Sequence, residues 1–308
     1  MILVINLNAS IDKRYEMLDF AKGKVMRAQQ VENTPGGKGI HVANVVTTLE
    51  EDCLATGFLG GKAGEFITEK LNEYKIAHDF VVINGETRSC IAIMTKDGVQ
   101  TEILEPGPVV EQNELQEFMM KYERLLEKAD VIVASGSVPK NVPSDIYVKL
   151  IHLANQAGKK FFLDTSGKLL ENGIKAQPYF IKPNKDEFEA LTGRKIIDMQ
   201  DAIDEVKKFM ANGIQLVVIS LGAKGSIVGY QDKVYKVKLP KVEAINPVGS
   251  GDAYVAGMAV AAVRNYSIEQ AIKFASACGT ANAVEKESGF VQKAMVEELV
   301  EKITVEKM

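Results

Sequence analysis

A glycine-rich turn joined to an acidic residue occupies positions 246–252, where Asn-Pro-Val-Gly-Ser-Gly-Asp runs into the apolar helical pattern of residues 253–263. Unpaired backbone N–H groups at a helix start, together with the positive end of the helix dipole, stabilise a phosphate. Gly249 and Gly251 let the backbone close around such an anion. Asp252 would lie beside it, where a carboxylate can accept a proton from an attacking hydroxyl. The alternative is a structural helix cap, since Ser, Gly and Asp are common there.

A second glycine-rich turn, Thr-Pro-Gly-Gly-Lys-Gly at residues 34–39, precedes the helical pattern of residues 40–49. It is not a Walker A motif, because Gly39 stands where that motif requires Ser or Thr after the lysine. One interpretation is that the open backbone and Lys38 contact a polar or anionic substrate. The other is a tight turn beside a solvated lysine, and the motif alone does not separate the two.

The composition limits the kind of protein. The chain has 308 residues, enough for one large α/β domain or one domain with an appendage, and we favour the second. Its 37 Lys and Arg and 41 Asp and Glu give a net charge of −4 without a basic cluster, so nucleic acid is not an expected partner. Cys53, Cys90 and Cys278 are far apart, which predicts neither disulfides nor a zinc site and favours a reducing cytoplasm. No segment has the pattern of a signal peptide or a membrane span.

Short apolar runs alternate with amphipathic helical patterns along most of the chain. This alternation predicts βαβ units on a mainly parallel sheet. The clearest strands and helices are expected at residues 2–7, 130–134, 145–155, 160–164, 201–210 and 216–221. Ligands of such sheets bind beyond the carboxyl ends of the strands. Small and polar residues follow the strands at 135–137, 164–167, 182–184 and 220–222. We therefore expect a binding cleft at that edge.

Two segments, 12–33 and 88–104, break the alternation and predict paired strands without a helix between them. In the second, Asp97-Gly98 supplies the turn of a β-hairpin. We expect these segments to form a small sheet that covers the cleft as a lid, over a core of residues 1–11, 34–87 and 105–308. An exposed sheet edge with an apolar face could also join two copies of the chain as a homodimer.

Four motifs occur together in one order, and the set is far more specific than any member: Gly36-Gly37-Lys38-Gly39, Lys182-Pro183-Asn184-Lys185-Asp186-Glu187, Ser220-Leu221-Gly222-Ala223-Lys224-Gly225 and Gly249-Ser250-Gly251-Asp252. On these residues the chain resembles the ribokinase-like carbohydrate kinases of the PfkB family, from residue 8 to residue 289. Further motifs resemble the branch with tagatose-6-phosphate kinase and 1-phosphofructokinase: Ser10-Ile11-Asp12, Gly85-Glu86-Thr87-Arg88, Ser135-Gly136-Ser137-Val138-Pro139 and Leu163-Asp164-Thr165-Ser166-Gly167. Asn246-Pro247-Val248 and the segment 282–286 are closer to the tagatose enzyme.

The resemblance implies a three-layer α/β/α core with a mainly parallel sheet and a small β-sheet lid. It implies an ATP- and Mg²⁺-dependent kinase that converts a ketohexose monophosphate into the 1,6-bisphosphate. Tagatose 6-phosphate is the first acceptor, and fructose 1-phosphate is the alternative. Two rivals remain: a kinase for an unphosphorylated sugar or nucleoside, and a non-catalytic sugar-phosphate sensor.

By the same resemblance, Asp252 is the base, and the N–H groups of the anion hole belong to Gly249, Ser250 and Gly251. Asn184 and Glu187, one helical turn apart, hold Mg²⁺ through water. Their structural alternative is an N-cap with a first-turn acid. Lys182 would lie at the nucleotide phosphates and Asn282 near the nucleobase. The full nucleotide-binding set is Lys182, Asn184, Ser220, Gly222, Gly225 and Asn282.

On the acceptor side, the resemblance implies that Asp12 binds sugar hydroxyls, while Arg88 and Lys38 bind a phosphate that the substrate already carries. The structural alternative for Arg88 is a solvated hairpin residue. The remaining acceptor-side candidates are Gly36, Gly37, His41, Ser137 and Arg27.

Three positions depart from the family pattern. His41 replaces the usual Asn after the glycine motif, so an amide that contacts the sugar becomes an imidazole. Ala9 replaces a proline, and Asn44 stands where this branch commonly carries Arg. None of the three belongs to the phosphoryl-transfer residues, so the resemblance defines the reaction better than the acceptor.

Overall fold

One large sheet forms the centre of the molecule in the computed structural model, which describes residues 1–308. Its strands are β1 (Ile2–Asn6), β4 (Cys53–Gly60), β5 (Ala77–His78), β6 (Val81–Ile83), β9 (Val131–Ser135), β10 (Lys160–Asp164), β11 (Phe180–Ile181), β12 (Leu216–Ser220), β13 (Ser226–Tyr230), β14 (Lys233–Lys238) and β15 (Thr304–Lys307). They lie in the order β15-β14-β13-β12-β11-β10-β9-β1-β4-β5, with β6 also paired to β4. Neighbours from β12 to β5 are parallel, whereas β13, β14 and β15 extend one edge antiparallel.

The central strand β1 shows why this part of the sheet is parallel. Its sequence Ile-Leu-Val-Ile-Asn is buried at every position, as expected for a strand covered on both faces. Alternate side chains of β1 enter two different apolar clusters, one on each side of the sheet. β1 lies between β4 and β9, so later strands of the sheet are added on both sides of it. The crevice beyond the carboxyl ends of the strands at such a switch point is the usual ligand site.

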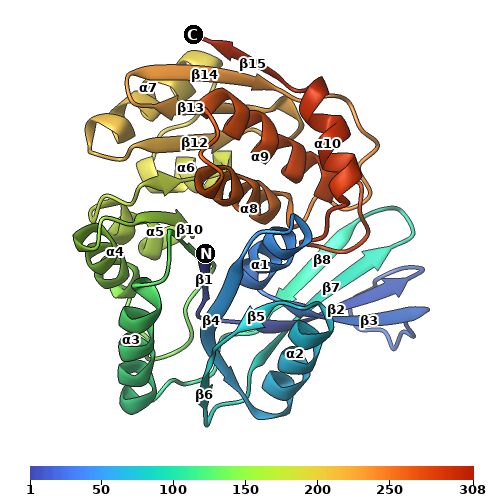
Figure 1. Cartoon of the computed structure of the whole chain (residues 1–308). Coiled ribbons are helices and arrows are strands. Elements are labelled where there is room, and N and C mark those ends of the chain that lie inside the picture. Colours follow the sequence, from blue (N-terminus) through green and yellow to red (C-terminus); the bar gives the residue numbers. More distant parts are fainter.

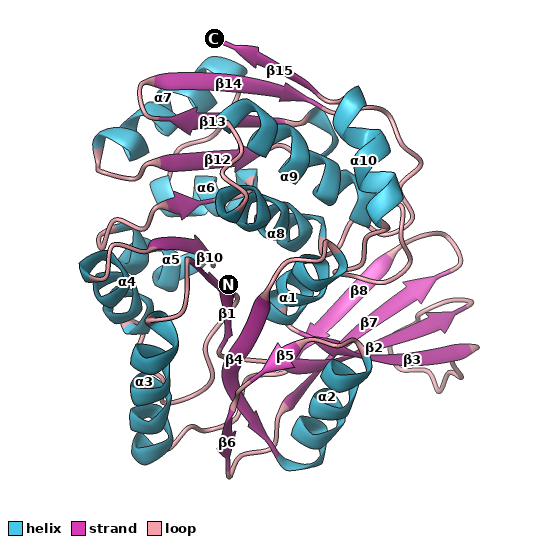
Figure 2. Cartoon of the chain, in the orientation of Figure 1, coloured by secondary structure: helices cyan, strands magenta, loops and turns pink.

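Helices cover both faces of the sheet and give three layers (Figures 1 and 2). One face is covered by α1 (Lys38–Thr48), α2 (Gly61–Glu73), α8 (Ser250–Val263), α9 (Ile268–Ala283) and α10 (Lys293–Lys302). The other is covered by α3 (Gln112–Leu126), α4 (Ile146–Gln156), α5 (Gly167–Ile174), α6 (Lys185–Thr192) and α7 (Met199–Ala211). None of these helices is long and apolar enough to cross a membrane.

Helix α8 lies deep in the core on the first face. Its residues Asp252–Ala261 are all buried, and it lies against both α1 and α9. A helix that is apolar on all sides belongs in the core. Core packing therefore fixes the position of its first turn, which carries Asp252.

A second sheet has four strands in the order β3-β2-β7-β8 and projects beside α1 and α2 (Figure 1). Its strands are β2 (Ser10–Met17), β3 (Gln30–Gly36), β7 (Arg88–Thr95) and β8 (Gln100–Leu104). β2 pairs antiparallel with β3 and parallel with β7, and β7 pairs antiparallel with β8. The hairpin turn at Asp97-Gly98 is present, with Gly98 at φ 80°.

The structure confirms the predicted mixed α/β architecture with a small second sheet. The strand predicted at 160–164 coincides with β10, and the helix predicted at 201–210 extends over Met199–Ala211. The paired strands of the first lid segment start at Ser10 and end at Gly36, beyond the expected limits of 12 and 33. Residue propensities do not predict where these two strands begin and end, because backbone pairing continues for as long as the partner strand lies within hydrogen-bond distance.

Candidate active site

A large cleft lies where the two sheets meet. Its volume is about 990 Å³, at the upper end of the range for small-molecule sites. The carboxyl ends of β1, β9, β10 and β12, the first turns of α1 and α8, and the inner face of the small sheet line it. The cleft predicted at the carboxyl edge of the strands is therefore present.

The N-terminus of α8 presents free backbone N–H groups to this cleft. Gly249 is the N-cap residue in the left-handed conformation, with φ 85°. The N–H groups of Gly249, Gly251 and Asp252 have no acceptor within the protein. A Cβ added to Gly251 would lie 3.1 Å from Lys182 Nζ, so the ammonium group faces the same point. Donors, helix dipole and lysine together form an anion site.

Ser250 differs from the prediction that its N–H belongs to the anion hole. That N–H donates to the carbonyl of Pro247 at 3.2 Å, and the hydroxyl accepts from Asn282 Nδ2 at 3.4 Å. The N–H is used because the chain turns back on itself just before the helix begins. Ser250 therefore shapes the loop, and its neighbours carry the free N–H groups.

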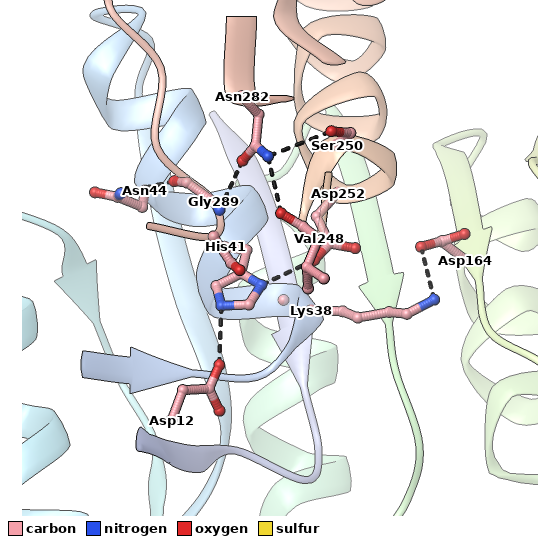
Figure 3. Close-up of polar contacts among 12 residues, drawn as sticks. Asp12, Lys38, His41, Asn44, Asp164, Val248, Ser250, Asp252, Asn282 and Gly289 are labelled. Carbon is pink, nitrogen blue, oxygen red and sulfur yellow. Dashed lines mark hydrogen bonds and ion pairs between the residues drawn. The ribbon is translucent and has the colours of Figure 1, made fainter. Parts of the chain in front are cut away.

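Asp252 lies in the first turn of α8 with only 5% of its surface exposed, and it faces His41 on α1 (Figure 3). Asp252 Oδ2 is 2.9 Å from His41 Nδ1, and the other ring nitrogen, Nε2, is 3.2 Å from Asp12 Oδ2. Asp12 also accepts a hydrogen bond from Ser10 at 2.8 Å. The histidine thus connects the expected base to the carboxylate expected to bind sugar hydroxyls.

The charge of His41 follows from these two contacts. Burial opposes protonation, but the hydrogen bonds and charges of Asp12 and Asp252 raise the pKa of His41 to about 10. Since ionised carboxylates only accept hydrogen bonds, both ring nitrogens carry a proton. At neutral pH the ring is an imidazolium between two carboxylates.

The stability of the protein should depend on this protonation. A histidine whose pKa is raised from about 6.5 to about 10 stabilises the fold fully below pH 6.5, and the stabilisation is lost as pH rises to 10. We expect the free energy of unfolding of the wild type to fall relative to that of His41→Asn, by roughly 1 kcal/mol per pH unit between pH 7 and 9. Urea denaturation at pH 7, 8 and 9 measures the difference. Parallel curves for the two proteins would show that His41 does not bind an additional proton in the folded state.

A second buried carboxylate, Asp164 at the end of β10, joins two lysines of the cleft. Asp164 is 2% exposed, and its oxygens lie 3.4 Å from Lys38 Nζ and 3.3 Å from Lys182 Nζ. Although burial opposes ionisation, the charges of Lys182 and Lys38 lower the pKa of Asp164. Asp164 in turn raises the pKa of Lys38. Figure 3 shows Lys38 reaching from α1 toward Asp164. In the sequence, Asp164 belongs to a motif but has no predicted role, and only its position at the end of an apolar strand marks it.

Asn184 and Glu187 form a capping box at the start of α6. Asn184 Oδ1 accepts from the Glu187 N–H at 2.8 Å, and Glu187 Oε2 accepts from the Asn184 N–H at 2.9 Å. The structural alternative for this pair is therefore realised. Both residues also line the cleft, and Glu187 Oε1 lies 3.9 Å from Lys38 Nζ, so that one carboxylate oxygen of Glu187 stays outside the cap.

The turn after β12 brings the predicted nucleotide residues to the cleft. Ser220, Gly222 and Gly225 all line it. Gly222 and Gly225 have φ of 59° and 94°, and a Cβ at Gly225 would lie 1.9 Å from the Val237 carbonyl oxygen. These glycines are required by the turn itself, which leaves the backbone exposed toward the cleft.

Asn282 was expected near the nucleobase, but its side chain is fully buried inside the protein. Its amide donates to the Val248 carbonyl at 2.9 Å and accepts from the Gly289 N–H at 2.8 Å. Asn282 therefore ties the loop before α8 to the loop after α9, because a buried amide must satisfy its polar atoms locally.

The acceptor side of the cleft contains Gly37, Lys38, His41, Ser137 and Arg88. Gly36 lies directly beside Asp12, and a Cβ at this position would come within 2.0 Å of the Asp12 carboxyl carbon. Gly37 is the N-cap of α1 at φ 102°. Gly36 thus lets the Asp12 side chain of β2 approach the backbone before α1, and Gly37 lets that backbone approach Asn6 of β1.

Two arginines lie differently from the expectation. The Arg88 guanidinium donates to the carbonyls of Asn8 at 3.1 Å and Glu105 at 2.9 Å. It therefore holds together the backbone where the small sheet joins the core, and only some of its N–H groups remain for a phosphate. Arg27 is exposed in the loop between β2 and β3 and does not line the cleft. Sequence position near the lid did not predict the direction of either side chain.

Two buried asparagines at the end of β1 were missed. Asn6 Oδ1 accepts from the Gly39 N–H at 3.2 Å, and Asn8 Nδ2 donates to Ser137 Oγ at 2.9 Å. Asn6 Nδ2 and Asn8 Oδ1 have no partner in the protein. Polar residues that end an apolar strand were the available signal, and both line the cleft.

Comparisons with known proteins agree with this geometry. The family described as "pfkB family carbohydrate kinase" matches residues 4–294. A tagatose-6-phosphate kinase of Staphylococcus epidermidis is 39% identical over 308 residues, which cover 99% of each chain. The solved structure of a Thermotoga maritima protein named "possible 1-phosphofructokinase" is 30% identical, with a TM-score of 0.91 over 100% of this chain and 99% of that one. Phosphofructokinase-2 from Escherichia coli has the same fold, with 24% identity and a TM-score of 0.91 over 98% of both chains.

Proposed function

Since the chain belongs to the pfkB family of carbohydrate kinases, we propose that it transfers the γ-phosphoryl group of ATP to a ketohexose monophosphate and forms the 1,6-bisphosphate. Family membership makes it a phosphotransferase with an alcohol acceptor. Tagatose 6-phosphate is the first acceptor, on the similarity to the Staphylococcus epidermidis enzyme over the whole chain. Fructose 1-phosphate is the second candidate, on the 30% identity to the Thermotoga maritima protein.

One observation carries the proposal: free N–H groups, the positive helix end and Lys182 converge within the cleft beside the Asp252 carboxylate. Phosphoryl transfer needs mainly positioning and stabilisation of charge on the transferring group. In the proposed step the acceptor O–H bond breaks, its oxygen bonds to the γ-phosphorus, and the bond from phosphorus to the ADP oxygen breaks. Asp252 takes the proton, and the N–H groups of Gly249 and Gly251 bind the oxygens of the transferring group.

A magnesium ion is part of the proposal through its donor set. No group of three or more His, Cys, Asp or Glu side chains is arranged to hold a metal. Glu187 lines the cleft with one oxygen outside the capping box, and Mg²⁺ prefers such oxygen ligands together with waters and substrate phosphates. The residues therefore fit an ion held through water by Glu187 and Asn184. When bound, the ion would neutralise charge on the nucleotide phosphates.

Arg88 should distinguish a phosphorylated acceptor from a free sugar. Three of its N–H bonds go to backbone carbonyls, and the remaining ones fit an acceptor phosphate. We expect Arg88→Lys to lower kcat/KM for the sugar phosphate by roughly tenfold or more, mainly through KM, and to change kcat/KM for the free sugar much less. Initial rates with both acceptors measure the two effects. Equal losses of kcat/KM for both acceptors would mean that Arg88 only holds the small sheet in place and does not bind the phosphate.

The acceptor is tested directly by a panel of sugar phosphates. The purified chain would be assayed with MgATP and tagatose 6-phosphate, fructose 1-phosphate, fructose 6-phosphate and free fructose, and the products read by ³¹P NMR. We expect the largest kcat/KM with tagatose 6-phosphate and a 1,6-bisphosphate product. Preference for a free sugar would reject the proposed acceptor class.

We also propose that the small sheet joins two copies of the chain. Val31 on β3 and Ile103 on β8 lie on one face of the sheet, and each is 49% exposed. Pairing would bury this apolar face. Sedimentation velocity should show a dimer for the wild type and a shift toward monomer for Ile103→Lys. A wild type that stays monomeric at high concentration would reject the proposal.

A cytoplasmic location is likewise proposed. Cys53, Cys90 and Cys278 are free thiols in the structure. Free thiols persist in a reducing compartment, and the nucleotide substrate belongs there. Cell fractionation would test the location.

A further inference from the structure

His41 connects two carboxylates that have separate tasks in the proposed reaction. We propose that His41 is a positioning residue that couples the acceptor site to the base: it fixes the separation of Asp12 and Asp252, so that an acceptor bound at Asp12 orients Asp252 toward the reacting hydroxyl. This inference rests on the proposed function and deepens it. Asp12 would bind neighbouring sugar hydroxyls, and Asp252 would take the proton.

The ring is suited to this role because it donates in two opposite directions. Nδ1 is 2.9 Å from Asp252 Oδ2, and Nε2 is 3.2 Å from Asp12 Oδ2. An Asn side chain, which the family pattern has at this position, carries its donors on one nitrogen and presents an acceptor oxygen beside it. An amide therefore cannot place a separate donor nitrogen against each carboxylate, whereas the imidazole ring has one nitrogen within 3.2 Å of each.

The surroundings hold the ring in place. Gly289 lies over His41, and a Cβ at Gly289 would come within 2.5 Å of His41 Cβ. The Gly289 carbonyl accepts from Asn44 Nδ2 at 2.8 Å, and its N–H donates to Asn282 at 2.8 Å. Figure 3 shows His41 enclosed between this segment and α8. The departures at His41 and Asn44 thus belong to one arrangement, in which Asn44 anchors the segment that covers the ring.

The contact between His41 and Asp252 also determines which Asp252 oxygen can take the proton. His41 occupies Asp252 Oδ2, whereas Asp252 Oδ1 has no hydrogen-bond partner in the protein. Both oxygens of Asp12 are engaged, by Ser10 and His41. In the transfer step the acceptor proton therefore goes to Asp252 Oδ1. His41 keeps both of its protons and acts only through orientation.

Kinetics of a double-mutant cycle test the coupling. We expect His41→Asn to lower kcat about 10- to 100-fold while the KM for ATP changes less than about twofold. Asp12→Asn in the wild type should lower kcat about tenfold and raise the acceptor KM, whereas in the His41→Asn background it should raise KM only. The matched control is His152→Asn, on the exposed side of α4, which should leave all constants unchanged. Additive effects on kcat would overturn the coupling.

A spectroscopic reading keeps the inference testable if a variant folds poorly or no acceptor is found. The chain has three histidines, so ¹⁵N-histidine spectra can be assigned to His41 by comparison with the His152→Asn and His78→Asn proteins. We expect both His41 nitrogens to carry protons at pH 7.5, and the Nε2 signal to move in Asp12→Asn. A neutral ring with one N–H would overturn the inference. If the ring is doubly protonated but the chain has no sugar-phosphate kinase activity, the proposed function is overturned, whereas the contacts of His41 with Asp12 and Asp252 are confirmed.

Discussion

Asp252→Asn is expected to lower kcat about a thousandfold, the range found when a general base is removed. Asparagine keeps the shape of the side chain but cannot accept the proton of the acceptor hydroxyl. The anion site is formed by backbone N–H groups and Lys182, so it survives the change. ATP binding, measured by calorimetry, should therefore stay within about threefold of the wild type while turnover is lost.

The control for this variant is Asp186→Asn, because Asp186 is likewise a first-turn acid of a helix, α6, but is exposed and does not line the cleft. It should have wild-type turnover. If Asp252→Asn retained near wild-type turnover with normal ligand binding, Asp252 would not be the base.

Asp164→Asn is expected to lower the free energy of unfolding by about 3 kcal/mol. The variant leaves the Lys182 ammonium, whose residue is only 6% exposed, without its carboxylate partner. A buried charge that loses its counter-charge is strongly destabilising. Urea denaturation at neutral pH measures the loss. Inorganic phosphate should restore part of the stability, because an anion bound beside Lys182 replaces the missing charge.

Two comparisons make this prediction specific. Adding Lys182→Met to Asp164→Asn should recover most of the lost stability, because both charges are then absent. The matched surface variant is Asp145→Asn, whose pair with Lys149 is about half exposed, and it should cost less than about 1 kcal/mol. A loss at Asp164 no larger than that at Asp145 would mean that the lysines do not depend on Asp164.

The sequence predicts the fold well where the signal is local. Apolar strands such as 160–164 and the hairpin at Asp97-Gly98 have patterns that few other structures satisfy, and the structure contains both. The two glycine turns also stand at the helix starts where they were expected. Together they locate the cleft, because parallel strands must end at one edge of the sheet.

Contacts between distant segments are what the sequence could not predict. His41 and Asp252 are separated by 211 residues, and no spacing rule relates them. Asp164 gains its importance from two lysines on other elements. Asn282 was assigned to the nucleobase, although its partners are buried backbone groups. For Asn184 and Glu187, a cap and a ligand pair have the same residue types at the same spacing, so the pattern alone cannot distinguish them.

The most direct test of the account is a crystal structure of the protein with MgADP, aluminium fluoride and tagatose 6-phosphate. Aluminium fluoride imitates the planar transferring phosphoryl group. We predict that its fluorines lie within hydrogen-bond distance of the Gly249 and Gly251 N–H groups, with Asp252 Oδ1 facing the acceptor hydroxyl. An anion bound away from the start of α8, or an Asp252 carboxylate turned from that hydroxyl, would contradict the account.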